Sequence, residues 1–279
     1  MNYTITRADI DSYCLSLAAE ERASGTIEKY RRDIVSFTLF LDGRSVTKEI
    51  ARDWKAYLQD RGYAPRTINT MLSALNSFFR FAGWDIKLKF LKIQHQLFRD
   101  PARELSRAEY DRLIVTARES GQKRLALIME TLCATGIRIS ELRYITVEAA
   151  KKGRTTIALK GKIRTILLPT KLCRKLVKYA KKQKFASGEV FLTKSGKSIT
   201  RRQVWYELKR LCHSAGVEPS KVFPHNFRHL FATTFYHACK DIARLADVLG
   251  HSSIETTRIY LTVSGAEQAR QLDELGLIS

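Results

Sequence analysis

One segment breaks a hydrophobic pattern that is helical along most of the chain. Thr155–Leu159 and Thr165–Leu168 are rich in residues that favour β-strands, and they flank the basic stretch Lys160–Arg164, which contains Gly161. Such runs on either side of a short glycine-containing stretch predict a β-hairpin with a basic tip. Val190–Thr193 is a candidate third strand. The sequence therefore predicts a mainly α fold with a small β-hairpin or sheet.

The charge balance favours a polyanionic partner. Lysine and arginine number 49 against 28 acidic residues, which gives a net charge of +21 and an isoelectric point near 9.9. Each phosphate that a cation neutralises releases counterions, so such an excess favours binding to nucleic acid. A soluble protein that is merely basic is the alternative, and the motifs have to decide between the two.

Cysteine usage and hydropathy limit the compartment and the kind of site. The five cysteines are scattered, odd in number and without a Cys-x-x-Cys pair, which favours neither a disulfide framework nor a thiolate zinc site. No apolar run approaches the roughly 20 residues that span a bilayer, and the N-terminus does not resemble a signal peptide. A glycine-rich phosphate-binding loop and an acidic pair for two metals are also missing. We expect a cytoplasmic protein with no membrane partner, no cofactor and no metal.

The first part of the chain is predicted to form one domain over residues 1–84. Apolar residues recur three and four positions apart in four stretches, as amphipathic helices require. Their expected positions are Arg7–Arg22, a stretch after Ser24, a stretch after Thr47, and a stretch from Pro65 to Gly83. The polar faces carry cations that are candidate ligands of phosphate, although an ordinary solvated face is the alternative for each: Lys29, Arg66 and Arg80.

Residues 85–103 break this pattern and separate it from a second helical region. They are rich in lysine and arginine and include Pro101, which favours a basic linker between domains. Ser106 and Glu109 form a capping box at the start of the next helix. A buried helix over Arg124–Thr135 ends at Gly136. We expect residues 104–279 to form an α+β domain that contains the hairpin.

Two motifs place cations at the expected starts of helices. Arg138 follows Gly136, and its planar guanidinium could bind two oxygens of a phosphate. A surface ion pair with Glu141 is the alternative interpretation. His225 and Arg228 lie three positions apart, so both project from one face of their helix.

Two further motifs follow near the C-terminus. His251 comes directly after a glycine that stops a helix, and Tyr260 lies nine positions later in a helical segment. A lone tyrosine in this context is most often a half-buried core residue. His229 is four positions after His225, which is the spacing of a metal pair, but Asn226 stands where a zinc-protease helix has its glutamate. Packing near the site is therefore the expected role of His229.

Together these motifs resemble those of the tyrosine recombinases, the phage integrase family. Thr135–Leu142 resembles their box I, and His-x-x-Arg-His, Leu-Gly-His and a tyrosine nine residues on resemble their box II. Thr67–Phe79 resembles the N-terminal core-binding domain of Xer-type recombinases and phage integrases, and Thr200–Trp205 resembles part of their catalytic domain. The resemblance implies a four-helix, SAM-like core-binding domain followed by a tyrosine-recombinase catalytic domain.

The resemblance also implies a role for each motif. Arg138 and Arg228 would hold the scissile phosphate, and Tyr260 would be the nucleophile. His225 and His251 would be the two histidines of the family's catalytic set. The chemistry is consistent with these roles, because arginines stabilise the charge on phosphate oxygens and a histidine can assist loss of the tyrosine proton.

The catalytic lysine is placed on the basic hairpin. A lysine can donate a proton to a leaving oxygen when its pKa is lowered, although basic hairpin tips are common without any such role. In the Xer-type recombinases that this chain resembles, the hairpin commonly reads Lys-Gly-x-Lys-x-Arg. The corresponding segment here, Lys160–Arg164, is one residue shorter. Lys160 is the preferred candidate and Lys162 remains open.

The implied function is site-specific recombination of duplex DNA. The strands would be cleaved and rejoined through a 3′-phosphotyrosyl intermediate and a Holliday junction, by a homotetramer on DNA. The apolar C-terminal residues Leu272, Leu275, Leu277 and Ile278 would dock on a neighbouring protomer or pack on their own domain. Relaxation of DNA, as by type IB topoisomerases, and non-catalytic DNA-binding regulation are the alternatives. The candidate DNA-binding residues are Lys29, Arg66, Arg80, Lys162, Arg164, Arg201 and Arg202.

Overall fold

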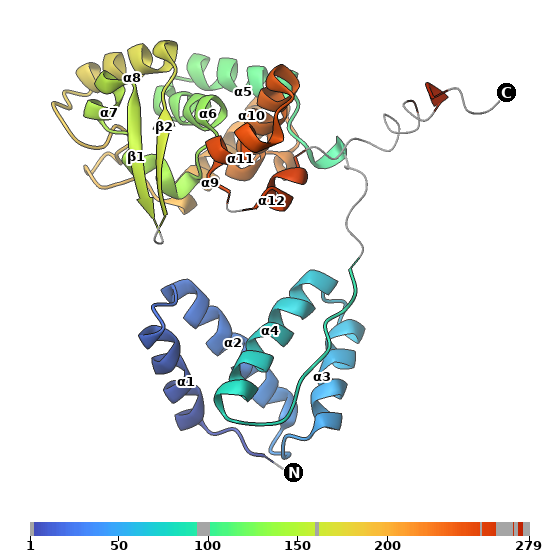
Figure 1. Cartoon of the computed structure of the whole chain (residues 1–279). Coiled ribbons are helices and arrows are strands. Elements are labelled where there is room, and N and C mark those ends of the chain that lie inside the picture. The colour runs from blue at the N-terminus through green and yellow to red at the C-terminus, as the bar shows by residue number, and fades with distance from the viewer. Residues whose placement is uncertain are drawn as a thin grey trace. The chain divides into compact units, whose positions relative to one another are not determined.

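The chain divides into two compact units, Met1–His95 and Gln96–Ser279. The computed structural model describes residues 3–93, 101–159, 162–251, 253–260, 270 and 273–275. Each unit has its own hydrophobic core. Figure 1 shows that helices dominate both units, which confirms the predicted mainly α fold.

The first unit contains, in its described residues, the four predicted helices. They are α1 (Arg7–Ala19), α2 (Ser24–Leu41), α3 (Lys48–Asp60) and α4 (Pro65–Phe81). Local signals fix the helix starts: the Thr6 side chain caps α1, the Thr47 side chain caps α3, and Pro65 occupies the first turn of α4. Aromatic and aliphatic side chains from all of these helices fill the core, including Tyr13, Phe37, Trp54, Leu72 and Phe78.

Residues 86–91, which were predicted to belong to the linker, pack on this first unit. Ile86 and Leu88 are buried in its core. The Asn76 amide donates to the carbonyl of Leu88 and accepts from its N–H, at 2.9 and 2.8 Å. Asn69 makes the same pair of hydrogen bonds with Leu91. Over residues 86–89 buried apolar residues alternate with exposed lysines, so one side of the extended segment can be buried while α4 amides satisfy its backbone.

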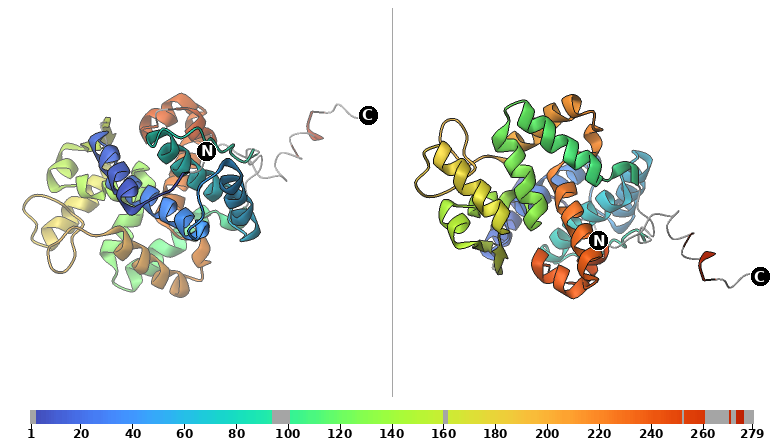
Figure 2. Two further views of the ribbon diagram at one scale, coloured as in Figure 1. Left: turned by 90° about the horizontal axis from the view of Figure 1, so that it is seen from below. Right: turned by 90° about the horizontal axis from the view of Figure 1, so that it is seen from above.

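The second unit is built around α6 (Lys123–Thr135), which packs against α5 (Arg107–Glu119), α8 (Thr170–Lys182), α9 (Arg201–Ala215) and α10 (Pro224–Cys239). Nearly every side chain of α6 from Leu125 to Leu132 is buried. Figures 1 and 2 place α8 at one side of this unit and α11 and α12 at the other. The remaining elements are η1 (Pro101–Arg103), η2 (Ile139–Tyr144), α7 (Val147–Lys152), η3 (Pro219–Lys221), α11 (Ile242–Leu249) and α12 (Glu255–Arg258).

The predicted hairpin is present as β1 (Arg154–Leu159) and β2 (Lys162–Leu167). The strands are antiparallel, with Arg154 opposite Leu167 and Leu159 opposite Lys162. The predicted third strand is wrong: in the described residues the sheet has only β1 and β2, and the 189–192 segment makes isolated bridges instead. Val190 and Phe191 are nevertheless buried. Their apolar character therefore reflects core packing rather than a place in the sheet.

The helix expected to start at Arg138 is the short 3₁₀ helix η2, and Tyr260 lies just after α12 rather than within a longer helix. Ala232, Leu245, Leu249 and Tyr260 form a small apolar cluster between α10, α11 and the turn after α12. None of the helices in the described part of the chain is long and apolar enough to cross a membrane.

Candidate active site

Arg138 is the N-cap residue of η2 and lies three residues after the last residue of α6. Its backbone N–H donates to Oε2 of Glu141 at 2.6 Å, and its Nη1 lies 3.2 Å from Oε1 of the same carboxylate. The Glu141 side chain is 2% exposed, whereas that of Arg138 is 45% exposed. The ion pair considered as an alternative is therefore real, but it leaves much of the Arg138 guanidinium open to a ligand.

Gly136 allows α6 to end where α10 and α11 approach it. Its φ of +62° is left-handed, which glycine adopts without the strain that a Cβ brings. A Cβ at this position would overlap the ring of Phe231 and lie 3.0 Å from Cδ2 of Leu249. The Thr-Gly ending thus brings Arg138 close to the two C-terminal motifs.

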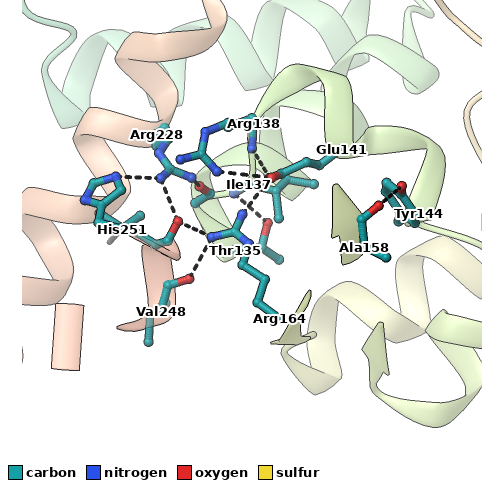
Figure 3. Close-up of polar contacts among 12 residues, drawn as sticks. Thr135, Ile137, Arg138, Glu141, Tyr144, Ala158, Arg164, Arg228, Val248 and His251 are labelled. Carbon is teal, nitrogen blue, oxygen red and sulfur yellow. Dashed lines mark hydrogen bonds and ion pairs between the residues drawn. The ribbon is translucent and has the colours of Figure 1, made fainter. Parts of the chain in front are cut away.

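Arg228 joins the motifs from its place on α10. Its guanidinium donates to the carbonyls of Gly136 and Leu249, the latter at 2.8 Å, and its Nη2 lies 2.9 Å from Nε2 of His251 (Figure 3). The residue is 2% exposed. Burial, and then the positive charge of Arg138, lower its pKa, but an arginine with these acceptors stays charged.

His251 follows the end of α11 at Gly250, whose φ is +65°. Its Nδ1 lies 2.8 Å from Oγ1 of Thr257 and its Nε2 faces Arg228. Because arginine only donates, Nε2 has to accept, and the single ring proton then belongs on Nδ1 and points to Thr257. The contacts therefore select one neutral tautomer of His251.

Tyr260 is packed into the same region. It is 2% exposed and its side chain hydrogen-bonds Arg228. The His251 ring lies nearly parallel to the tyrosine ring with centroids 5.9 Å apart, and the rings of His225 and His229 lie 6.2 and 5.1 Å away. Tyr260 is therefore buried, as the alternative of a core tyrosine predicts, and it also lies among the predicted site residues.

Two histidines of this site, His225 and His251, are held neutral at pH 7. Loss of hydration, and then the charges of Arg228 and Arg138, lower the pKa of His251 to about 4 and lower that of His225. Neutral imidazoles can accept a proton at pH 7, and an anion held by the arginines would oppose the shift.

The hairpin residues differ from expectation in one respect. Arg164 was expected to contact DNA, but its guanidinium turns inward to Glu141 and to the carbonyls of Val248 and Leu249. The reason is that the buried Glu141 carboxylate offers a strong acceptor on the inner side of β2. Lys160 and the side chain of Lys162 lie outside the described part of the structure.

The other candidate DNA-binding cations are at the surface. Arg66 and Arg80 are exposed on α4, and Arg201 and Arg202 are exposed at the start of α9. Lys29 is partly covered, with its Nζ 2.5 Å from the buried carboxylate of Asp33.

Sequence reasoning missed three residues that shape the site. Glu141 was considered only as a surface partner of Arg138, and its burial has no signal in the sequence. Thr257, which bonds His251, lies three positions before Tyr260, a spacing that a helical turn would bring to the same face. Glu104 lies 3.7 Å from Nε2 of His229, far away in sequence. In the described residues, no group of three His, Cys, Asp or Glu side chains could hold a metal ion.

Two family models match the chain. The model for the phage integrase family matches residues 103–267, and that for the phage integrase N-terminal SAM-like domain matches residues 10–85. Tyrosine recombinase XerA of Pyrococcus furiosus is 28% identical over 99% of this chain and 96% of its own length. XerA of Thermococcus kodakarensis is 30% identical over 95% of this chain and 94% of its own length.

Solved structures show the same fold. The XerH site-specific recombinase in a post-cleavage complex with a palindromic difH substrate aligns with a TM-score of 0.74 and 18% identity, covering 99% of this chain and 85% of that one. The Tn1549 transposon integrase in complex with transposon right end DNA aligns with a TM-score of 0.73 and 19% identity, covering 95% and 98%. The chain therefore belongs to the phage integrase family and is a tyrosine recombinase, an enzyme of site-specific DNA recombination.

Proposed function

We propose that this recombinase cleaves duplex DNA with Tyr260 and exchanges strands through a Holliday junction, acting in the cytoplasm. The single observation that supports the assignment most strongly is the contact network of Arg228. It brings box I, the Leu-Gly-His turn and Tyr260 together around one buried guanidinium. These segments are far apart in the sequence, and a phosphate near Arg138 would lie beside them all.

The reaction needs no external energy source. The Tyr260 oxygen attacks phosphorus, a 3′-phosphotyrosyl bond forms, and the bond to the 5′-oxygen of the next nucleotide breaks. The free 5′-hydroxyl of a partner strand then reverses these steps and releases the tyrosine. One phosphate ester replaces another at each step, so no nucleotide cofactor is required.

The cations stabilise charge on the phosphate. Arg138 is the more exposed arginine and is positioned to contact two phosphate oxygens, while Arg228 supplies a fixed charge behind it. The neutral histidines His225 and His251 can take up the tyrosine proton or hydrogen-bond the phosphate. In this proposal Lys160, or alternatively Lys162, protonates the leaving 5′-oxygen.

Both parts of the chain are proposed to bind duplex DNA. Residues 1–84 would serve as the core-binding domain, residues 85–103 as the link, and residues 104–279 as the catalytic domain. Exposed arginines from both domains would contact DNA phosphates. They are Arg66 and Arg80 on α4, and Arg201 and Arg202 on α9. Lys29 and Lys162 would add to this surface. XerH and the Tn1549 integrase, the structural relatives named above, were solved in complex with DNA, which is consistent with this partner.

We further propose a homotetramer on DNA. A lambda integrase that aligns with a TM-score of 0.73 was solved as a tetramer bound to a Holliday junction. In this chain Leu275 is 60% exposed, and Leu272, Leu277 and Ile278 of the same tail lie outside the described residues. A largely apolar cavity of about 410 Å³ between α5, α6, α8 and α10 could receive such a tail from a neighbour; Cys133, Leu172, Leu230 and Phe235 contribute to its wall.

A plasmid assay tests the proposed function. A supercoiled plasmid with two copies of the recombination site should yield deletion or inversion products, and one without the site should stay supercoiled. Efficient relaxation of the plasmid without sites would instead identify a topoisomerase. Binding without any covalent protein–DNA adduct would identify a regulator.

A further inference from the structure

Arg164 occupies an inward position on β2 that its place in a basic hairpin did not suggest. Its side chain is 14% exposed. Nη2 lies 2.6 Å from Oε2 of Glu141, and Nη1 donates to the carbonyls of Leu249 and Val248, the latter at 3.3 Å (Figure 3). A strand residue thus hydrogen-bonds both the acid beside Arg138 and the end of the helix before His251.

Arg164 shares its acceptors with the two site arginines. Oε2 of Glu141 also accepts the backbone N–H of Arg138, and the carbonyl of Leu249 also accepts from Arg228. Any movement of the Arg164 guanidinium therefore alters the surroundings of both arginines. Networks of this kind, in which buried acceptors are shared, couple the positions of their members.

The Gly250 turn is shaped to admit this side chain. A Cβ at Gly250 would lie 2.5 Å from Cδ and 2.6 Å from Nη1 of Arg164. The glycine therefore serves two needs, a left-handed backbone and a close approach by the arginine. The side chain crosses directly over the turn that orients His251.

We propose that Arg164 is a positioning residue, which fixes the hairpin and the Gly250–His251 turn to the two phosphate-binding arginines. The inference rests on the proposed cleavage by Tyr260. Arg164 lies four residues after Lys160 and two after Lys162, opposite Ile157 and therefore near the tip of the hairpin that is expected to deliver the catalytic lysine. Fixing β2 at Arg164 sets where that lysine can reach.

An arginine is required here because its acceptors lie in different directions. The planar guanidinium can donate to the Glu141 carboxylate through one nitrogen and to main-chain carbonyls through another. A lysine carries one ammonium group at the end of a flexible chain and cannot bridge the same groups in a fixed geometry. The variant Arg164→Lys therefore keeps the positive charge and loses the fixed arrangement of hydrogen bonds.

The test measures the rate of covalent adduct formation on a nicked DNA that carries the recombination site. Arg164→Met should slow this step about 100-fold, as a displacement of about 1 Å at a reacting centre does. Arg164→Lys should still slow it by at least about 10-fold. Arg154→Met is the matched control, because Arg154 is an exposed cation at the base of the same hairpin, and its rate should equal that of the wild type.

Two further readouts separate positioning from DNA contact and from general loss of structure. The slope of log K against log salt for site binding should not change in Arg164→Met, because an inward guanidinium neutralises no phosphate. The His251 ring, titrated by NMR in the protein without DNA, should show a raised pKa in Arg164→Met but not in Arg154→Met, because the Arg164 charge is one of the causes that lower it.

Specific outcomes would overturn the inference. A salt slope smaller by about one, with normal cleavage once bound, would make Arg164 a phosphate contact. A wild-type cleavage rate in Arg164→Lys would show that charge alone suffices, and this variant decides the matter if Arg164→Met does not fold. If the wild type itself forms no adduct on the site, the proposed function fails; if it does and both Arg164 variants match it, only this inference fails.

Discussion

Nη2 of Arg228 lies 2.9 Å from Nε2 of His251, and the guanidinium can only donate in this hydrogen bond. The contact therefore forms only while Nε2 of His251 is unprotonated. Protonating Nε2 would remove the acceptor and bring two positive charges together. A bound phosphate would relieve that repulsion, so an anion at the site would favour protonation of His251.

The pH dependence of stability should carry the signature of His251. Its pKa is about 4 in the folded protein and 6.5 as the ordinary value, so the unfolded chain binds more protons between these limits. The free energy of unfolding should therefore rise from pH 4 to 6.5, with the contribution fully present above 6.5 and lost as the pH falls toward 4. Urea denaturation over this range should show a flatter dependence for His251→Gln.

An exposed histidine of α9 provides the control for that measurement. His213→Gln should keep the slope of the wild type, because His213 lies at the surface. Equal slopes for the wild type and His251→Gln would show that the Arg228 contact does not hold His251 neutral.

Substitutions of the two site arginines should differ in their effect on stability and have similar effects on DNA cleavage. Arg228→Ala leaves the buried carbonyls of Gly136 and Leu249 without this donor, which should cost about 2–4 kcal/mol. Arg138→Ala removes a half-exposed ion pair and should cost less than about 1 kcal/mol. Both should slow adduct formation by more than about 100-fold. Thermal denaturation and the cleavage assay measure the two effects, and an equal loss of stability would contradict the geometry described for Arg228.

The close approach at Gly136 should appear as excess destabilisation by alanine. Gly136→Ala and Gly153→Ala both place a Cβ on a left-handed residue, at φ of +62° and +70°, which costs about 1–2 kcal/mol. Only the Cβ at Gly136 would overlap Phe231, which should add about 1–3 kcal/mol. The difference between the two melting temperatures isolates this term. If the two variants melt together, Phe231 moves aside freely and Gly136 is needed for its backbone alone.

The helices and the site motifs could be predicted from local features of the sequence. Capping residues such as Thr6, Ser106 and Thr200 mark helix starts because they bond backbone groups three residues away. Glycines at 136 and 250 mark helix ends because they favour left-handed backbone. The order of Arg138, Arg228, His251 and Tyr260 along the chain pointed to the family, and in the structure the side chains of the last three lie in contact.

Features that depend on distant neighbours escaped prediction. Val190–Thr193 has the composition of a strand, but its apolar residues are explained by burial in the core. Residues 86–91 were assigned to a linker because their docking depends on Asn69 and Asn76 of α4. Arg164 was assigned to DNA because nothing in the sequence shows that Glu141 is buried on the inner side of the hairpin.

The C-terminal tail should serve assembly rather than folding or site binding. Deleting residues 271–279 should leave binding to a single site unchanged, because the candidate phosphate ligands all precede them. It should abolish complexes that hold two sites together, as measured by native gel shift with two labelled DNAs. If the tail instead packs on its own domain, the truncated protein should melt at a lower temperature. Normal recombination by the truncated protein would refute the docking role.

The identity of the nucleophile tests the account most directly. Tyr260→Phe removes only the phenolic oxygen and keeps the ring that packs with Ala232 and Leu249, so the fold and site binding should be nearly unchanged. On a nicked suicide substrate the wild type and Tyr236→Phe, a tyrosine variant on neighbouring α10, should become attached to the 3′-phosphate. Tyr260→Phe should form no covalent adduct. An adduct with Tyr260→Phe, or its loss in Tyr236→Phe alone, would contradict the assignment of Tyr260 as the residue that cuts DNA.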